Sequence, residues 1–541
     1  MSEFDFIVVG AGSAGCVLAN RLTENGKYTV LLLEAGGSDN HPWILMPIGY
    51  GKAFYRSSIN WMYMTEPNPG LDDRVSYWPR GKVMGGSSSI NAMVYVRGQK
   101  SDFDGWRDMG NPGWGWDGVL PYFRKMETND SGADAYRGGD GPLHVSTVAS
   151  DHHPLCQTFI EAGSQLQLPH NRDFNGASLE GLGSYQITMK NGMRMSASRA
   201  YIRPAARRPN LSIEKKAHVT KVLFEGKRAC GVRFVQSGQE KSVSARREVI
   251  LAAGAINSPQ LLQLSGIGPA ELLNSKGIDV LHAAEGVGRN LQDHLCIDYL
   301  FRSKVPTLNN QLYPWWGKLL QGMRYVLTRG GPLSLSLNQA GGFVRSRPEL
   351  DDPNIQLFFS PVSYTKAPPG KRPLMNPDPF PGFLLSGQPT RPTSRGYLAI
   401  RSADPFAAPE IHPNYLATDQ DLQELLETSK LLRRFSDTPA LASVIDAEIA
   451  PGPDVRTDEE LMADIRARAS TVFHPVGTCR MGPDRQVDVV DARLRVHGLE
   501  GIRIADASIF PTLTSGNTNA PAIMVGEKAA DLIIEDHVSN G

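Results

Sequence analysis

Three glycines near the N-terminus have the spacing of a dinucleotide-binding turn. Gly10, Gly12 and Gly15 form the pattern G-x-G-x-x-G between the β-rich run DFIVVG and the helical run SAGCVLANRLTEN. Without side chains at these positions, the backbone and the positive N-terminus of the helix can approach a pyrophosphate. Glu34 ends the next apolar run, where an acidic side chain would bind ribose hydroxyls and repel a 2′-phosphate. The pattern predicts a dinucleotide site, and a tight turn without a ligand is the alternative.

A second glycine-rich loop could also bind phosphate. It runs from Arg80 to Asn91 and reads RGKVMGGSSSIN. The consecutive residues Gly85, Gly86 and Ser87 offer a row of backbone N–H groups that could form a phosphate nest. A β-turn with local serine hydrogen bonds explains the same residues equally well.

The C-terminal part combines a histidine with the start of a helix. His474 lies in the segment FHPVGTCRMG, and further on a short predicted strand ends at Asp506. Asn517, Thr518 and Asn519 then precede a proline and a run of small residues, which is where a helix is expected to begin. A helix N-terminus carries about half a positive charge. It would stabilise a reduced flavin, because such a ring carries negative charge near N1 and the C2 carbonyl. An ordinary capped surface helix is the alternative.

Composition excludes several classes of protein. The chain has 541 residues, with 56 basic and 56 acidic side chains, so a formal net charge of zero argues against nucleic acid as a partner. No apolar run approaches the roughly 20 residues of a membrane span. The five cysteines are dispersed and never spaced as C-x-x-C, so neither a disulfide framework nor a metal site is expected. The first strand leaves no room for a signal peptide, and we expect a cytoplasmic location.

Two kinds of segment alternate along the chain. Residues 5 to 34 predict a βαβ unit, and residues 247 to 268 predict a buried strand, a turn and a helix. Between about 300 and 465, alternating segments such as NIQLFFS and GYLAIRS are separated by proline-rich loops, which suggests an antiparallel sheet. Glycine-rich motifs return after Ser470, so we expect the chain to revisit its first domain there.

Five motifs follow one another along the chain. They are the N-terminal glycines with Glu34, GKVMGGSSSIN, GAINSPQLLQLSGIG, VGRNLQDH, and HPVGTCRMG with SGNTNAP. Their order is typical of the glucose-methanol-choline (GMC) oxidoreductases, FAD enzymes that oxidise alcohols. The chain resembles this family over nearly its whole length, and its choline dehydrogenase-like branch in particular. We interpret Asp293 and His294, which end one of these motifs, as structural rather than catalytic.

The resemblance implies an α/β fold with two domains. One is an FAD-binding Rossmann-like domain, and the other is a substrate domain in which helices flank an antiparallel sheet. We expect residues 1–155, 190–300 and 465–541 in the FAD-binding domain. Residues 156–189 and 301–464 are expected in the substrate domain.

The resemblance also assigns roles to individual residues. His474 matches the family's catalytic histidine, and Asn517 matches a second active-site position that is His or Asn in different members. Imidazole is suited to removing the hydroxyl proton at neutral pH. Phe473 is expected to wall the pocket, and Trp315 and Trp316 could belong to an entrance lid or to the core. The expected cofactor contacts are Gly10, Gly12, Ser13, Gly15, Glu34, Ala35, Trp61, Arg80, Gly81, Val83, Gly85, Gly86, Ser87, Asn91, Val94, Val219, Gly254, Asp506, Ala507, Thr518 and Asn519.

The expected function is FAD-dependent oxidation of an alcohol, with a quinone or another carrier as electron acceptor. A dehydrogenase is favoured because the branch that the chain resembles consists mostly of dehydrogenases, and an oxidase that uses O₂ is the main alternative. A lyase or a photoenzyme is a less favoured alternative, because hydroxynitrile lyases and a light-driven fatty-acid decarboxylase belong to the same fold. A flavoprotein without catalytic activity, and an enzyme that binds NAD in place of FAD, are also less favoured. Ile90 replaces the histidine to which some relatives bond their flavin, so we expect noncovalent FAD. The alcohol and the oligomeric state are left open.

Overall fold

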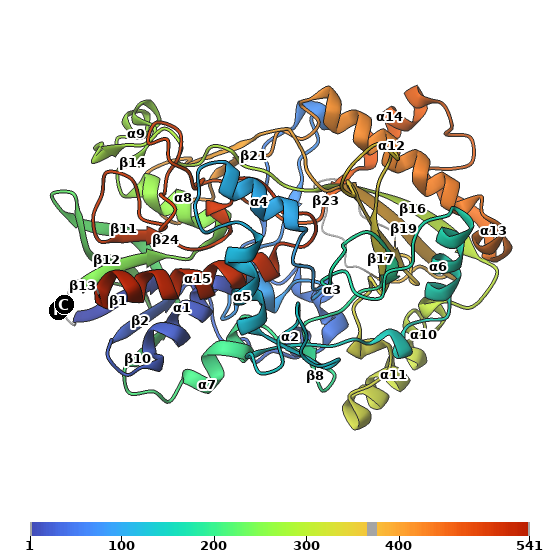
Figure 1. Cartoon of the computed structure of the whole chain (residues 1–541), viewed down its shortest axis with the longest axis horizontal. Coiled ribbons are helices and arrows are strands. Elements are labelled where there is room, and N and C mark those ends of the chain that lie inside the picture. The colour runs from blue at the N-terminus through green and yellow to red at the C-terminus, as the bar shows by residue number, and fades with distance from the viewer. Residues whose placement is uncertain (1–2, 365–375, 539–541) are drawn as a thin grey trace.

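Two sheets lie at opposite ends of an elongated molecule (Figure 1). The computed structural model describes residues 3–364 and 376–538. Residues 1–2, 365–375 and 539–541 fall within the expected domain ranges but outside the described part of the chain. Each of the two large sheets has seven strands in the described residues.

The first sheet is mostly parallel and is assembled from distant parts of the chain. Its parallel strands lie in the order β10-β2-β1-β13, with β24 also beside β13. The antiparallel strands β12 and β11 extend it on one side. The strands are β1 (Glu3–Val9), β2 (Val30–Glu34), β10 (Leu211–Lys215), β11 (Ala217–Glu225), β12 (Arg228–Gln236), β13 (Gln239–Leu251) and β24 (Ile502–Ile504).

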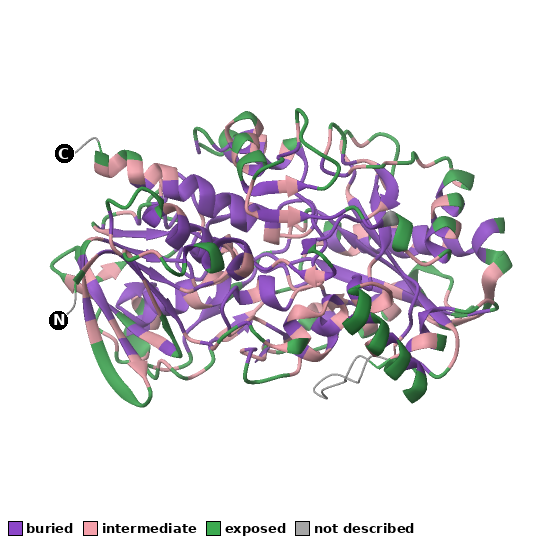
Figure 2. Cartoon of the chain, turned by 90° about the horizontal axis from the view of Figure 1, so that it is seen from below, coloured by how far each residue is buried: buried purple, intermediate pink, exposed green. Residues whose placement is uncertain are grey.

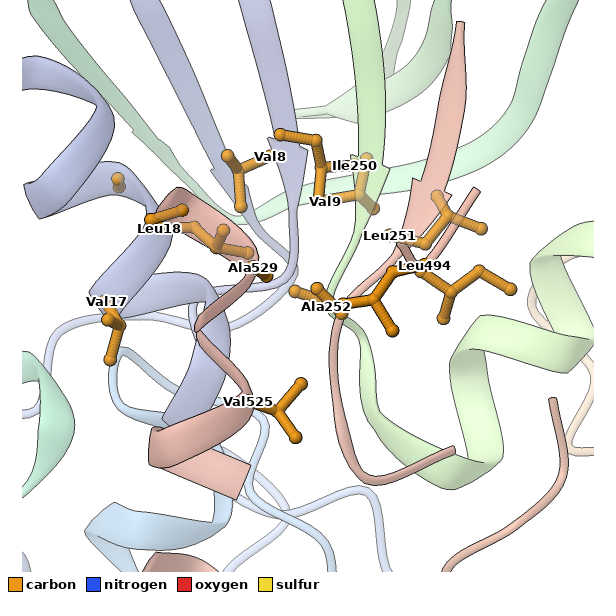
Figure 3. Packing of buried hydrophobic residues seen from close by; sticks show 14 of the residues in the cluster. Val8, Val9, Val17, Leu18, Ile250, Leu251, Ala252, Leu494, Val525 and Ala529 are labelled. Atoms are coloured by element: carbon orange, nitrogen blue, oxygen red, sulfur yellow. The ribbon is translucent and has the colours of Figure 1, made fainter. Parts of the chain in front are cut away.

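Helices from both ends of the chain cover this sheet. Helix α1 (Ser13–Glu24) connects β1 to β2, which confirms the predicted βαβ unit. Helix α15 (Asn519–Val538) packs on α1, and a Cβ at Gly526 would lie 2.9 Å from the carbonyl oxygen of Ala14. Glycine at this position therefore permits the close approach of the two helices. Figure 3 shows side chains of the core that result, among them Val9, Leu251, Leu494, Val525 and Ala529.

The second sheet is antiparallel, as the alternating segments predicted. Its strands are β7 (Gly181–Ser184), β16 (Leu295–Ser303), β17 (Ala340–Val344), β18 (Ile355–Ser360), β19 (Gly382–Pro389), β22 (Ile445–Ala450) and β23 (Ser470–Thr471). The neighbouring helices are α6 (Leu155–Gln165), α10 (Leu308–Leu312), α11 (Trp315–Thr328), α12 (Asp419–Ser436), α13 (Pro439–Val444) and α14 (Asp458–Arg468).

The remaining elements lie outside the two large sheets. The helices are α2 (Pro42–Leu45), α3 (Tyr50–Ala53), α4 (Lys100–Asp108), α5 (Trp116–Met126), α7 (Arg203–Ala205), α8 (Gly254–Leu264) and α9 (Ala270–Ser275). The strand pairs are β3 (Tyr63–Met64) with β4 (Tyr77–Trp78), β5 (Glu127–Asn129) with β6 (Leu143–Val145), β8 (Met189–Lys190) with β9 (Met193–Arg194), β14 (Ile267–Gly268) with β15 (His282–Ala283), and β20 (Tyr397–Ala399) with β21 (Glu410–His412).

The domain ranges stay a prediction. Strand β16 crosses residue 300 and belongs wholly to the second sheet, and β23 joins that sheet from beyond residue 464. Among the described helices, none is both long and apolar enough to cross a bilayer.

Candidate active site

A cavity of about 980 Å³ is lined by residues of both sheets. This volume is at the upper end of the roughly 300–1,000 Å³ that ligand pockets usually have. The glycine loops and Glu34 form one part of its wall, and β18 and β19 contribute another. A large ligand could therefore reach from the first sheet to the second.

The first glycine loop exposes bare backbone to this cavity. A Cβ at Gly10 or Gly15 would collide with a backbone oxygen, at 2.6 Å from Ala252 and 1.9 Å from Gly10 respectively, so both glycines are required for packing. Gly12 and Gly254 differ, because a Cβ at Gly12 would meet nothing closer than 3.7 Å and one at Gly254 nothing within 4 Å. Both line the cavity, and a side chain at either position would occupy part of it.

The second glycine loop packs directly on the first. Gly85 and Gly86 have φ values of +87° and +53°, a conformation that favours glycine. The Gly85 N–H donates to the Ala11 carbonyl at 2.7 Å, and a Cβ at Gly86 would lie 2.7 Å from the Cα of Gly12. The two loops therefore form one continuous backbone surface at the cavity.

Glu34 lies at the carboxyl end of β2 and its side chain is held by backbone donors. Its two carboxylate oxygens accept hydrogen bonds from the N–H groups of Ala11, at 2.9 Å, and Gly36, at 2.7 Å. Burial raises the pKa of this carboxyl to about 7. A carboxylate has about four acceptor positions, so acceptor capacity is left for ribose hydroxyls.

Asp506 is buried at the cavity and holds the start of α8. One oxygen accepts from the Gly254 N–H at 2.8 Å and the Ser258 hydroxyl at 2.6 Å, and the other accepts from the Ser508 N–H at 2.7 Å. These contacts give Asp506 a role in shaping the wall.

The N-termini of α1 and α15 meet at the cavity. The Ser13 hydroxyl donates to the side-chain oxygen of Asn519 at 2.8 Å, across 506 positions of sequence. Asn519 is the first residue of α15, which confirms the predicted helix start. Two helix N-termini, each with a partial positive charge, therefore favour an anionic group at this wall.

His474 is buried beside two other polar side chains. Its Nδ1 lies 3.0 Å from Nδ1 of His294, and its Nε2 lies 3.1 Å from the amide nitrogen of Asn517. His294 Nε2 in turn lies 2.8 Å from the carbonyl oxygen of Thr390.

These contacts determine where the protons are. A carbonyl oxygen only accepts, so His294 carries its proton on Nε2 and, when neutral, presents a lone pair at Nδ1. His474 must then donate from Nδ1, which leaves a lone pair on its Nε2. Burial lowers the pKa of His294 to about 4 and that of His474 well below its usual value, the latter aided by the neighbouring His294 and Arg80. Both rings are therefore neutral at neutral pH.

Two glutamines of the second sheet orient Asn517. The side-chain oxygen of Asn517 accepts from Gln356 Nε2 at 3.3 Å, and the side-chain oxygen of Gln356 accepts from Gln388 Nε2 at 3.0 Å. Gln356 and Gln388 lie opposite each other on β18 and β19 and are fully buried. This chain of amides directs the NH₂ group of Asn517 at His474.

Asp293 fixes the backbone that carries His474. It accepts from the His474 N–H at 2.6 Å and from the hydroxyls of Thr471 and Tyr415. Burial raises the pKa of Asp293 to about 6. Arg80 donates to the Phe473 carbonyl oxygen at 2.6 Å. The loop is therefore held on both sides of the histidine.

Most of the expected site residues line the cavity. The exceptions are Gly15, Val83 and Gly85, which do not line it. Gly15 permits the close contact of α1 with β1, Val83 is buried in an apolar cluster, and Gly85 adopts the positive φ of its turn. The expected residues on its wall are Gly10, Gly12, Ser13, Glu34, Ala35, Trp61, Arg80, Gly81, Gly86, Ser87, Asn91, Val94, Val219, Gly254, Phe473, His474, Asp506, Ala507, Asn517, Thr518 and Asn519.

Sequence reasoning missed the part of the site contributed by the second sheet. Gln356 and Gln388 lie in the buried strands β18 and β19, and Thr390 directly follows β19. None of the three belongs to a recognisable motif, and the only signal for the two glutamines is a polar side chain within a buried strand. The cavity wall on this side is mainly apolar and aromatic, and includes Tyr50, Phe54, Phe358, Tyr364, Phe380 and Leu384. Within the described residues, no group of three or more His, Cys, Asp or Glu side chains could hold a metal.

Comparisons with known proteins agree with this geometry. Sequence models of the GMC oxidoreductase family match residues 4–296 and 392–526. An alcohol dehydrogenase [acceptor] of Pseudomonas putida is 44% identical over 98% of this chain and 96% of its own length. The mitochondrial choline dehydrogenase of Mus musculus is also 44% identical, over 98% of this chain and 89% of its own.

Similar structures have been solved. An FAD-dependent oxidoreductase from Chaetomium thermophilum superposes with a TM-score of 0.90 and 28% identity, covering 99% of this chain and 100% of that one. The resemblance therefore extends over the entire fold, including both sheets that line the cavity.

Proposed function

Since this chain belongs to the GMC oxidoreductase family, we propose that it is an FAD-dependent dehydrogenase that oxidises an alcohol to an aldehyde or ketone. One observation carries the proposal. The cavity that the glycine loops line also contains a neutral histidine whose Nε2 lone pair is directed at the Asn517 amide.

The residues present fit FAD. The bare backbone at Gly12 and Gly254 leaves room for a pyrophosphate, and the N-termini of α1 and α15 favour its charge. Glu34 would accept from the ribose hydroxyls. When bound, the flavin supplies the acceptor for a hydride from the alcohol carbon.

His474 is proposed as the base and Asn517 as the group that binds the alcohol oxygen. His474 Nε2 and the Asn517 amide nitrogen lie 3.1 Å apart and face each other. One alcohol hydroxyl could therefore donate its proton to His474 Nε2 and accept a hydrogen bond from the Asn517 NH₂ group. Removing the hydroxyl proton raises the electron density on the carbon and so favours hydride release. Phe473 would wall the pocket beside them.

The proposed acceptor is a quinone or another carrier. Both relatives named above are dehydrogenases, which favours this over O₂, and an oxidase is the second candidate. Cys16, Cys156, Cys230 and Cys479 are free thiols, which supports a reducing cytoplasmic compartment as part of the proposal.

An anaerobic screen of alcohols tests the function. A substrate should bleach the flavin absorbance in the dark, and subsequent O₂ should restore the colour slowly if the enzyme is a dehydrogenase and rapidly if it is an oxidase. A lyase or a photoenzyme would leave the flavin oxidised with every alcohol, which would contradict the proposal.

FAD should be held noncovalently. Ile90 is buried at the cavity wall and packs in an apolar cluster with Ile44 and Val83. An alkyl side chain cannot form the bond to the flavin that a histidine at this position would form. Acid precipitation should therefore release yellow FAD into the supernatant. Colour that stays with the washed pellet would disprove this.

The rate of flavin reduction should fall as the pH is lowered through about 6, the pKa of Asp293. A carboxyl with a raised pKa takes up its proton below that value, and protonated Asp293 loses acceptor capacity toward the loop of His474. His474 itself stays neutral there, because burial lowers its pKa well below the usual value. In the variant Asp293→Asn, stopped-flow measurements should show that the rate of flavin reduction depends much less on pH below about 6. If the rate falls as steeply as in the wild type, a group other than Asp293 takes up the proton.

A further inference from the structure

Helix α11 turns its apolar side chains toward solvent. The exposed fraction is 76% for Trp315 and 82% for Leu327. Figure 1 places this helix at the lower edge of the molecule, and Figure 2, seen from that side, shows it as largely exposed. Trp315 and Trp316 are exposed, so the expectation of a core position is wrong. Neither lines the cavity, and an entrance lid stays a prediction. The other exposed apolar residues of the helix are Trp316, Leu319, Leu320, Met323 and Val326.

Helix α11 buries its small and polar residues and exposes its apolar ones, whereas a surface helix usually does the opposite. Gly317, Gln321 and Tyr325, spaced by four residues, are the buried positions. The Tyr325 hydroxyl donates to the Gly192 carbonyl oxygen at 2.9 Å. The helix is thus attached through a narrow stripe of small and polar residues. Its broad apolar face remains uncovered by the described residues, whereas an ordinary surface helix buries that face.

The sequence around α11 is basic. Residues 299–348 contain seven Lys or Arg and no Asp or Glu, in a chain whose net charge is zero. Lys318 and Arg324 lie on α11, and Arg329 follows it. All three are exposed. The apolar face is therefore flanked by positive charge.

We propose that α11 docks this protein on the surface of an anionic phospholipid bilayer. A helix with Trp and Leu on one face and Lys or Arg beside it is typical of helices that lie in the plane of the membrane interface. Trp315 and Trp316 would occupy the head-group region that indole rings prefer. The cytoplasmic leaflet is the anionic one, which is consistent with the proposed compartment.

The size of the face favours lipid over a second copy of the chain. At about 1.5 Å per residue and about 10 Å in width, a helix of 14 residues covers on the order of 200 Å². A stable protein interface needs about 800 Å² on each partner. Fourteen residues are also too few to span a bilayer, so the helix would lie on the surface.

Helix α11 is connected to the cavity wall through α10. Tyr50 lines the cavity and packs against Leu308 and Leu312 of α10, which precedes α11. If the proposed function holds, a lipid-soluble acceptor would enter near this wall. Docking itself does not depend on the function, and its test uses no activity.

Flotation with vesicles tests the proposal. The holoenzyme should float with mixed phosphatidylethanolamine–phosphatidylglycerol vesicles, and the variant Trp315→Gln/Leu319→Gln/Leu327→Gln should bind more than tenfold more weakly because it loses three large apolar side chains. Lys318→Gln/Arg324→Gln should lose roughly fivefold per residue on these vesicles and almost nothing on phosphatidylcholine alone.

A matched control keeps the outcome decisive. Met109→Gln/Val487→Gln removes two exposed apolar side chains outside α11 and should float like the wild type. All variants should reduce a soluble dye with alcohol at the wild-type rate, since none of these residues lines the cavity. The proposal is overturned if the wild type does not float or if the triple variant floats equally well. A wild-type dimer that the triple variant splits, without flotation, would instead make α11 a self-association surface.

Discussion

Replacing His474 with alanine should lower the rate constant for flavin reduction by an alcohol roughly 10²- to 10⁴-fold, the usual contribution of a positioned base. The variant removes the Nε2 lone pair that faces Asn517, while the glycine loops and Glu34 that would hold FAD stay intact. Anaerobic stopped-flow spectroscopy measures the rate, and the FAD content of the purified variant should equal that of the wild type.

A second histidine provides the control for this variant. His152 is half-buried, its Nδ1 lies 3.2 Å from the hydroxyl oxygen of Ser184, and it does not line the cavity. His152→Ala should therefore reduce its flavin within a few-fold of the wild-type rate. If His474→Ala did so as well, or if its defect were confined to reoxidation of the flavin, His474 would not be the base.

His294→Leu should lower the same rate constant roughly 10- to 100-fold, a loss common when a group that orients a reacting side chain is removed. His294 accepts the proton of His474 Nδ1, and its own Nε2 is held by the Thr390 carbonyl at 2.8 Å. Without this acceptor, His474 can carry its proton on Nε2, and that tautomer cannot accept the hydroxyl proton. A wrong tautomer is a large defect in other histidine-dependent enzymes.

The conservative variant separates this positioning role from packing. His294→Asn presents a side-chain oxygen to His474 Nδ1 and should lose less activity than His294→Leu. Nitrogen NMR of labelled histidine should show His474 protonated on Nδ1 in the wild type and as a mixture of tautomers in His294→Leu. Equal rates for both variants, with an unchanged tautomer, would reduce His294 to a packing residue.

The cofactor part of the site could be predicted because it is built from local sequence. Gly10, Gly12 and Gly15 stand in one turn between β1 and α1, and their spacing alone brings bare backbone to a helix N-terminus. Glu34 follows at the end of the next strand, and Asn519 begins α15 as its capping pattern predicted. In each case the chemistry depends on a few consecutive residues, whose backbone geometry is set mainly by their own types.

The protonation state of His474 could not be predicted in this way. It depends on Thr390 through His294, and the orientation of Asn517 depends on Gln356 and Gln388. Gln356 and Gln388 face each other only in the observed register of β18 and β19, and a slip of one residue would turn them to the other face of the sheet. No local pattern records that register.

The sequence by itself determined the βαβ unit, its glycine turn and the antiparallel second sheet, because these follow from local spacing and periodicity. The family followed from the resemblance of five ordered motifs. The tertiary structure decided which nitrogen of His474 is free and which way α11 faces. The spacing of its Trp, Leu and Met residues predicts an amphipathic helix equally well with that face buried or exposed. Only packing against Gly192 and its neighbours, through Tyr325, turns the apolar face outward.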